Sequence, residues 1–160
     1  PLSFMPQNQE MRDLVAKMKL IPVKELIDGN RIVFCDDSIV RGTQFQDNVK
    51  DLFQCGAKEL HVRPACPTLI FPCVFLNFSA SRTTLDLAGR RAIDQLGDGE
   101  EHLDEYATPG TDRYYAMIEK IRERLGVTTL QYQHLDDLIE AIGLPKEKVC
   151  THCWDGSSYF

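Results

Sequence analysis

Residues 31–43 constrain the fold of this chain more than any other stretch. They begin with the apolar run Ile32-Val33-Phe34, which is typical of a strand that is covered on both faces of a sheet. Two adjacent carboxylates follow, and then a short loop that ends at Gly42. Beyond the loop, apolar residues recur at helical spacing, at Phe45, Val49, Leu52 and Phe53. The stretch therefore predicts a strand, a loop at its carboxyl end, and a helix that stops near Gly56.

The loop between this strand and this helix has the features of a phosphosugar site. Thr43 is the predicted N-cap of a helix whose first turn offers unpaired backbone N–H groups and the positive end of the helix dipole. Gly42 lets the backbone come close to an anion such as a monophosphate. Asp36 and Asp37 can accept hydrogen bonds from a vicinal diol, or approach a magnesium ion that a polyphosphate carries. A diol and a phosphate together indicate a ribose 5-phosphate.

The acidic pair and Arg41 also have simpler interpretations. Two acidic residues after a strand are often a solvated turn or the cap of the following helix. The combination of buried strand, acidic pair, glycine and hydroxyl favours the phosphosugar site over that reading. Arg41 would either touch the phosphate or lie on the surface.

The rest of the chain predicts an α/β fold. Leu60 and Val62 alternate with polar residues in a second strand that ends at Pro64, so strand, helix and strand form one parallel crossover unit. Further strands are expected at 74–78 and at 127–130. The helical patterns cover residues 5–19, 83–96, 112–125 and 135–142, the last two stopping at Gly126 and Gly143. Residues 97–111 are expected to form a surface loop.

Size and charge exclude several classes of protein. The chain has 160 residues, 43% of them hydrophobic, which suits one domain with a real core. Lys and Arg number 18 against 24 Asp and Glu, and the net charge of −6 argues against non-specific nucleic-acid binding. No apolar run has membrane-spanning length, and no charged-then-apolar leader precedes the first helix, so we expect a cytoplasmic protein without a membrane partner.

Six cysteines are interpreted as reduced thiols, because Cys35 and Cys55 fall at apolar strand and helix positions of the kind that small core residues occupy. Cys150 and Cys153 have the spacing of half a metal site. The alternative is that these thiols simply pack beside the core. The four histidines are scattered, with no partner at ligand spacing.

Several strings resemble the amidophosphoribosyltransferases, whose second domain is a type I phosphoribosyltransferase that uses phosphoribosyl pyrophosphate (PRPP). The strings are Asp36-Asp37-Ser38-Ile39-Val40-Arg41-Gly42-Thr43, Phe4-Met5-Pro6-Gln7-Asn8-Gln9, Gly56-Ala57-Lys58-Glu59-Leu60-His61-Val62, Phe71-Pro72-Cys73 and Cys150-Thr151-His152-Cys153-Trp154. One departure concerns the phosphate loop. The family usually continues Thr-Thr-Ser after the glycine, whereas this chain has Thr43-Gln44-Phe45 and lacks one or two hydroxyls there.

The resemblance implies the C-terminal half of a phosphoribosyltransferase domain over residues 1–82, with a helical extension of the same domain over 83–160. The fold class would be an incomplete type I phosphoribosyltransferase, a Rossmann-like parallel sheet flanked by helices. Residues 36–43 would bind PRPP, with Asp36 and Asp37 near its Mg²⁺, and Arg12 and Lys17 would belong to a flexible loop that closes over the pyrophosphate. The parent polypeptide would carry a glutaminase domain, form a homo-oligomer, and transfer ammonia from glutamine to carbon 1 of PRPP in purine synthesis. The abrupt start at Pro1 suggests a piece of that polypeptide, inactive by itself.

The resemblance also implies a metal role for three cysteines. One branch of the family holds a structural [4Fe–4S] cluster, and Cys73, Cys150 and Cys153 match three of its four ligands. The fourth would lie upstream of this chain, so His152 or another cysteine could instead complete a zinc site. A rival function is a regulatory module that binds PRPP without reacting it, which the altered Gln44 and Phe45 favour slightly. A salvage phosphoribosyltransferase is disfavoured, because those chains lack the flexible-loop string and the terminal cysteine pair.

Overall fold

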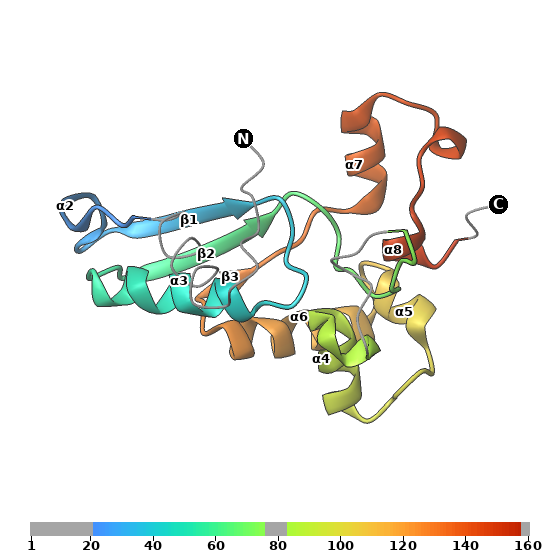
Figure 1. Ribbon diagram of the computed structural model, residues 1–160, viewed down its shortest axis with the longest axis horizontal. Helices are drawn as coiled ribbons and strands as arrows, with labels where there is room; N and C mark the ends of the chain where they lie inside the picture. The colour runs from blue at the N-terminus through green and yellow to red at the C-terminus, as the bar shows by residue number, and fades with distance from the viewer. Residues whose placement is uncertain (1–20, 76–82, 158–160) are drawn as a thin grey trace.

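A parallel sheet organises the computed structural model, which describes residues 21–75 and 83–157 (Figure 1). Within these residues the sheet has three strands in the order β1-β2-β3. They are β1 (Arg31–Asp36), β2 (Glu59–Pro64) and β3 (Thr129–Leu130). Helix α3 (Thr43–Gln54) connects β1 to β2, so the predicted crossover unit is confirmed. Arg31 lies opposite Glu59 in the first ladder, and His61 lies opposite Thr129 in the second.

Helices α3 and α6 (Asp112–Leu125) lie on the same side of the sheet (Figure 1). The apolar stripe of α3, predicted from its spacing, is buried at Phe45, Val49 and Leu52. In β2, Leu60 and Val62 are fully buried because alternate side chains of a strand point to the same face. Met117 of α6 is buried as completely. One core therefore joins the sheet to both helices.

The expectation that β1 is covered on both faces is wrong for the described part of the chain. Its residues alternate between exposed and half-buried, and the Val33 side chain is 65% exposed. Ile32 and Phe34 pack against the core under α3, so Val33 and Cys35 face the opposite way. Cys35 is consequently exposed rather than a core residue.

The second half of the chain is mainly helical. Its elements are η1 (Thr84–Asp86), α4 (Ala88–Leu96), α5 (Leu103–Ala107), α6, β3, α7 (Leu135–Ile142), η2 (Lys146–Lys148) and α8 (His152–Asp155). The predicted helices 112–125 and 135–142 are confirmed, and each ends at a glycine in the left-handed conformation, Gly126 and Gly143. Near the start of the described chain lies the short helix α2 (Lys24–Ile27).

Three details differ from the sequence predictions. Helix α4 starts at Ala88 instead of 83, because Leu87 is extended and separates α4 from the 3₁₀ turn η1. The segment 97–111, expected to be a loop, contains α5. Val74 and Phe75 lie in an exposed bend rather than a strand. The remainder of that predicted strand, the helix predicted at 5–19, Arg12 and Lys17 lie outside the described residues.

The two halves of the chain share their core. Strand β3 comes from the second half and pairs with β2 of the first. Ile93 of α4 and Tyr106 of α5 belong to the same buried cluster as Leu60 and Val62. None of the described helices is long and apolar enough to cross a membrane.

Candidate phosphosugar site

The loop of residues 37–42 is tied down at both ends. At its start, the Ala65 backbone N–H donates to the Asp36 carbonyl over 2.8 Å, which joins the carboxyl ends of β1 and β2. Near its end, the Ala88 N–H donates to the Val40 carbonyl over 2.8 Å and connects the loop to the start of α4. The Ile39 side chain is 3% exposed and belongs to the core. The loop is thus held by the sheet, by α4 and by an apolar anchor.

The two carboxylates of the acidic pair accept hydrogen bonds from the backbone of the first half of this loop. The Asp37 N–H donates to Asp36 Oδ1 over 2.9 Å, and the Ser38 N–H donates to Asp37 Oδ1 over 2.6 Å. Each carboxylate uses one oxygen to fix the turn, which orients the other oxygen. Burial raises the pKa of Asp36, and the charge of neighbouring Asp37 adds to that rise. A hydroxyl donor or a cation beside the pair would relieve this repulsion.

The second half of the loop opens into the N-terminus of α3. Gly42 is the N-cap, in the left-handed conformation with φ of 77°, and Thr43 is the first helical residue. The prediction that Thr43 caps the helix is therefore wrong, because the chain turns one residue earlier. The residue at the cap position has no side chain, and no described side chain caps α3 in its place. Its first-turn N–H groups can therefore serve an anion.

The two departures from the family string differ in their consequences. Phe45 is only 6% exposed and stacks edge-on against Phe34, with ring centroids 5.1 Å apart. Its side chain is thus part of the core beneath the loop. Gln44 is exposed. Packing explains the phenylalanine, so Phe45 no longer favours the regulatory module over the enzyme.

Arg41 projects from the loop toward the turn η1. Its guanidinium lies 3.9 Å from the Asp86 carboxylate, and its side chain is 49% exposed. At that separation and exposure the ion pair contributes little to stability. Arg41 therefore has a surface partner and remains free enough to reorient toward a ligand.

Cys66 is a neighbour of the acidic pair that the sequence interpretation missed. It follows the carboxyl end of β2, beside β1, and it is half-buried. Burial raises the pKa of its thiol to about 11, and the charge of Asp37 adds to the effect. The sequence did contain a signal for this. Cys66 comes just after the second parallel strand, and the carboxyl ends of parallel strands lie at the same edge of the sheet, so Cys66 should lie near the acidic pair.

The predicted metal cysteines lie together in part. The Cys153 carbonyl accepts hydrogen bonds from the N–H groups of Ile70 and Phe71, over 3.0 and 3.1 Å, which brings α8 beside the segment that holds Cys73. Burial raises the pKa of Cys153 to about 11, with adjacent Cys73 and then Cys150 adding to the rise. In the described ranges no group of three or more Cys, His, Asp or Glu side chains is arranged to hold a metal ion. Cys35, Cys55, Cys66, Cys150 and Cys153 are free thiols in the structure.

Comparisons with known proteins bear on this geometry. No protein-family model matches the chain. An amidophosphoribosyltransferase of Methanothermobacter thermautotrophicus is 31% identical over 154 residues, which is 96% of this chain and 27% of the relative. That of Mycobacterium bovis is 33% identical over 155 residues, or 96% of this chain and 25% of the relative. The chain thus spans about a quarter of the length of these curated relatives, which are phosphoribosyltransferase enzymes.

Solved structures agree with the sequence relatives. A glutamine PRPP amidotransferase from B. subtilis, complexed with ADP and GMP, superimposes with a TM-score of 0.64 at 25% identity. The alignment covers 99% of this chain and 30% of that one. A second structure, of the allosteric regulatory enzyme of purine biosynthesis, gives a TM-score of 0.62 at 23% identity and supports the fold. The resemblance inferred from the sequence and the α/β phosphoribosyltransferase fold class are therefore confirmed.

Proposed function

We propose that this chain, which resembles part of the amidophosphoribosyltransferases over nearly its whole length, forms the PRPP-binding portion of such an enzyme. The observation that carries the proposal is the loop itself. An acidic pair at the end of β1 leads through a left-handed Gly42 into the uncapped N-terminus of α3. Donors for a phosphate and acceptors for a diol thus lie at opposite ends of one short loop.

Each half of the loop has a distinct role in this proposal. Asp36 and Asp37 accept hydrogen bonds from the two ribose hydroxyls. Backbone N–H groups between Ser38 and Thr43 bind the 5-phosphate, and Ile39 anchors them through its buried side chain. As carbon 1 of the ribose becomes cationic, the nearby carboxylates stabilise its charge. Binding, orientation and charge would supply most of the catalysis.

Mg²⁺ fits the donor set of the acidic pair. Carboxylate oxygens are hard ligands, and the pKa of Asp36 is raised first by burial and further by the adjacent charge of Asp37, which a cation would offset. When bound, the ion would neutralise charge on the pyrophosphate of PRPP. Arg12 and Lys17, which lie in the part of the chain outside the described residues, would approach the pyrophosphate from the flexible loop.

The intact enzyme would join ammonia to carbon 1 of PRPP. The nitrogen forms a bond to carbon 1 as the bond from that carbon to the pyrophosphate oxygen breaks. Pyrophosphate leaves with the electron pair, and the nitrogen loses a proton to give 5-phosphoribosylamine. A glutaminase domain of the same polypeptide would release the ammonia, and the enzyme would form a homo-oligomer. The isolated segment would not turn over by itself.

The cysteines of the second half would support a structural [4Fe–4S] cluster. Burial raises the pKa of Cys153, and the nearby Cys73 and then Cys150 add to that rise, so the three side chains lie near one another. Soft thiolates are suitable ligands for iron–sulfur clusters and for zinc. Since these three are an incomplete set, the remaining ligand must come from another part of the protein.

The test is a calorimetric titration of the intact protein with magnesium PRPP. The variant D36N/D37N removes both charges while keeping side-chain size, and its affinity should fall about a hundredfold, because charge-assisted hydrogen bonds are lost. The matched control is D136N/D137N, an adjacent and exposed acidic pair in the first turn of α7. It changes net charge equally and should bind as the unmodified protein does. Equal affinity of both double variants would refute the assignment of residues 36–43.

A second assay separates the enzyme from the regulatory alternative. The intact protein is given magnesium PRPP and ammonium, and released pyrophosphate is measured. The enzyme should release pyrophosphate at a rate that depends on ammonium and is lost in D36N/D37N. A regulatory module would bind PRPP with the same dependence on the acidic pair but release no pyrophosphate.

A further inference from the structure

Three arginines from separate elements lie where the phosphosugar loop enters α3. They are Arg41 in the loop, Arg91 on α4 and Arg124 in the last turn of α6. The end of α6 contacts the start of α3, because the Gln46 side chain of α3 donates a hydrogen bond to the Arg124 carbonyl oxygen. The next residue, Leu125, has its side chain beside Gly42. Arg124 is therefore held next to the phosphate half of the loop.

Arg91 joins this group from α4, which packs on α6. Its Nε donates to the Leu85 carbonyl oxygen over 3.0 Å, which holds the guanidinium beside η1. Burial lowers the pKa of Arg91, and the positive charge of nearby Arg124 lowers it further, while Asp86 opposes the shift. Asp86 is also the carboxylate that Arg41 approaches, so it faces two of the three arginines.

Arg91 and Arg124 differ in their pairing from most arginines of this chain. Those that form ion pairs with other carboxylates are Arg31, Arg90, Arg113 and Arg122. Within residues 21–75 and 83–157, no carboxylate forms an ion pair with Arg91 or Arg124. Acidic residues outnumber basic ones in the whole chain by 24 to 18, so two neighbouring arginines without an ion pair run against its average charge.

The charges around these arginines leave the start of α3 locally positive. Asp47 of α3 lies 3.5 Å from the Lys50 ammonium, and Glu123 of α6 lies 3.1 Å from that of Lys120. These two carboxylates are thus largely offset by partners of their own. The first turn of α3 carries no acidic residue, so the positive end of its dipole adds to the charge of the arginines.

We propose that Arg91 and Arg124 attract the anionic substrate toward the phosphate half of the loop. The inference rests on the proposed function, because it takes the ligand to be a phosphorylated sugar. The chain as a whole carries a net charge of −6 and repels such a ligand. A local group of positive charges reverses that repulsion at the loop. Long-range attraction of this kind raises the association rate and leaves the dissociation rate nearly unchanged.

The size of the effect follows from charge and distance. Two unit charges about 10 Å apart in water change a rate constant about twofold through their interaction. A phosphate monoester carries close to two charges, and screening is weak at about 20 mM salt. Loss of one arginine should therefore slow association about two- to threefold under these conditions.

Arg124→Gln and Arg124→Glu test the proposal at an exposed side chain, so we expect both variants to fold. Association and dissociation of magnesium PRPP with the intact protein are measured by stopped flow at about 20 mM and about 500 mM salt. At low salt, association should slow about two- to threefold in Arg124→Gln, and by about the square of that factor in Arg124→Glu, because the change of charge is doubled. Dissociation should be unchanged, and the differences should vanish at high salt.

The matched control is Arg31→Gln. Arg31 is exposed as well and lies at the opposite end of β1, where it pairs with Glu59 over 3.2 Å. Its removal changes the net charge of the chain equally and should leave the association rate nearly unchanged. If Arg31→Gln slows association as much as Arg124→Gln does, net charge governs binding instead of local placement, and the proposal is overturned.

Arg91 is tested by two variants that both remove the guanidinium bonded to Leu85. Arg91→Gln also removes the charge, whereas Arg91→Lys keeps it. Arg91→Gln should slow association at low salt as Arg124→Gln does, and Arg91→Lys should associate at the normal rate. Equal slowing in both variants would show that Arg91 acts through its hydrogen bond, against the proposal.

Two further outcomes would overturn the attraction by Arg124. Faster dissociation that persists at high salt would make Arg124 a direct contact of the phosphate, and an unchanged association rate at low salt would show that its charge does not reach the ligand. Neither outcome affects the proposed function, which fails instead if D36N/D37N binds magnesium PRPP normally. If the unmodified protein does not bind magnesium PRPP, both the proposed function and this inference are wrong.

Discussion

Gly42 is the residue whose substitution tests both the fold and the site. Its φ of 77° places it in the left-handed region, where a side chain costs roughly 1–2 kcal/mol. A Cβ at this position would lie 3.2 Å from Leu125 Cδ2 and 3.7 Å from Ile39 Cγ2. The first contact is tight, but it involves the end of a flexible side chain that can move. Gly42→Ala should therefore lower the free energy of unfolding by about 1–2 kcal/mol.

Binding should respond more strongly than the strain alone would suggest. In the proposed binding mode the methyl group would lie where the loop backbone approaches the 5-phosphate, so we expect the affinity for magnesium PRPP to fall at least about tenfold. Urea denaturation measures the first effect and calorimetry the second. Gly143→Ala is the control, because Gly143 has a φ of 72° and no atom within 4 Å of an added Cβ. It should lose similar stability, about 1 kcal/mol, with unchanged binding.

Two outcomes would contradict this reasoning. If Gly42→Ala is as stable as the unmodified protein, the left-handed turn before α3 is not formed. If both variants lose stability equally and both bind PRPP normally, the loop does not approach the phosphate at Gly42. Either result would require a different location for the 5-phosphate.

Three further predictions concern other parts of the fold. Gly89→Ala should lower the melting temperature, because a Cβ at this position would lie 2.9 Å from the Leu69 carbonyl oxygen. This crowding costs about 1–3 kcal/mol, which exceeds what alanine gains over glycine in helix propensity. A higher melting temperature would show that the contact relaxes. Hydrogen bonds from Arg113 and then Tyr106 lower the pKa of Asp98, so its stabilising effect is full above its unfolded pKa of about 3.9 and is lost as pH falls through the folded pKa. Urea midpoints between about pH 2 and 6 should therefore fall less steeply on acidification in Asp98→Asn than in the unmodified protein; parallel curves would exclude this contribution. Alkylation at pH 8 followed by peptide mapping should label exposed Cys35 before Cys66, whose pKa is raised to about 11, and the difference should disappear in urea; equal native rates would contradict the burial of Cys66.

Local patterns predicted the elements of this fold well where the signal was periodic and ended in glycine. The apolar spacing of 112–125 and of 135–142 matched the bounds of α6 and α7, because each helix stops where a glycine takes up the left-handed conformation. The acidic pair was correctly placed at the end of β1. These features depend on residues close together in sequence.

Features that depend on distant neighbours were predicted less well. An apolar run cannot show whether one or both faces of its strand are covered, so the exposure of Val33 and Cys35 was missed. The cap of α3 was placed one residue late, because glycine and threonine are both acceptable caps and the turn geometry decides between them. The sequence allowed two interpretations of Phe45, as part of the apolar stripe of α3 and as an altered position of the phosphate loop, and its packing on Phe34 favours the first.

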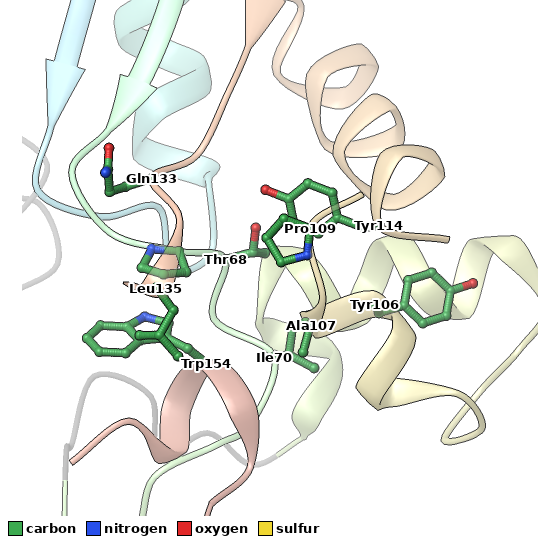
Figure 2. Close-up of a pocket in the computed structure, with 10 residues that line it drawn as sticks. Thr68, Ile70, Tyr106, Ala107, Pro109, Tyr114, Gln133, Leu135 and Trp154 are labelled. Atoms are coloured by element: carbon green, nitrogen blue, oxygen red, sulfur yellow. The ribbon is translucent and has the colours of Figure 1, made fainter. Parts of the chain in front are cut away.

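The sequence by itself determined the strand-loop-helix unit that carries the acidic pair, the bounds of helices α6 and α7, and the resemblance to amidophosphoribosyltransferases. Only the tertiary structure placed Cys66 beside Asp37, α8 beside the segment after β2, and a small cavity lined by Thr68 and Trp154 between them (Figure 2). The physical reason is one of range. Helical and strand periodicity and glycine conformation act over a few residues. A shared edge of a sheet or a buried cavity is formed by side chains that are far apart in sequence. Thr68 and Trp154, which line the same cavity, are 86 positions apart.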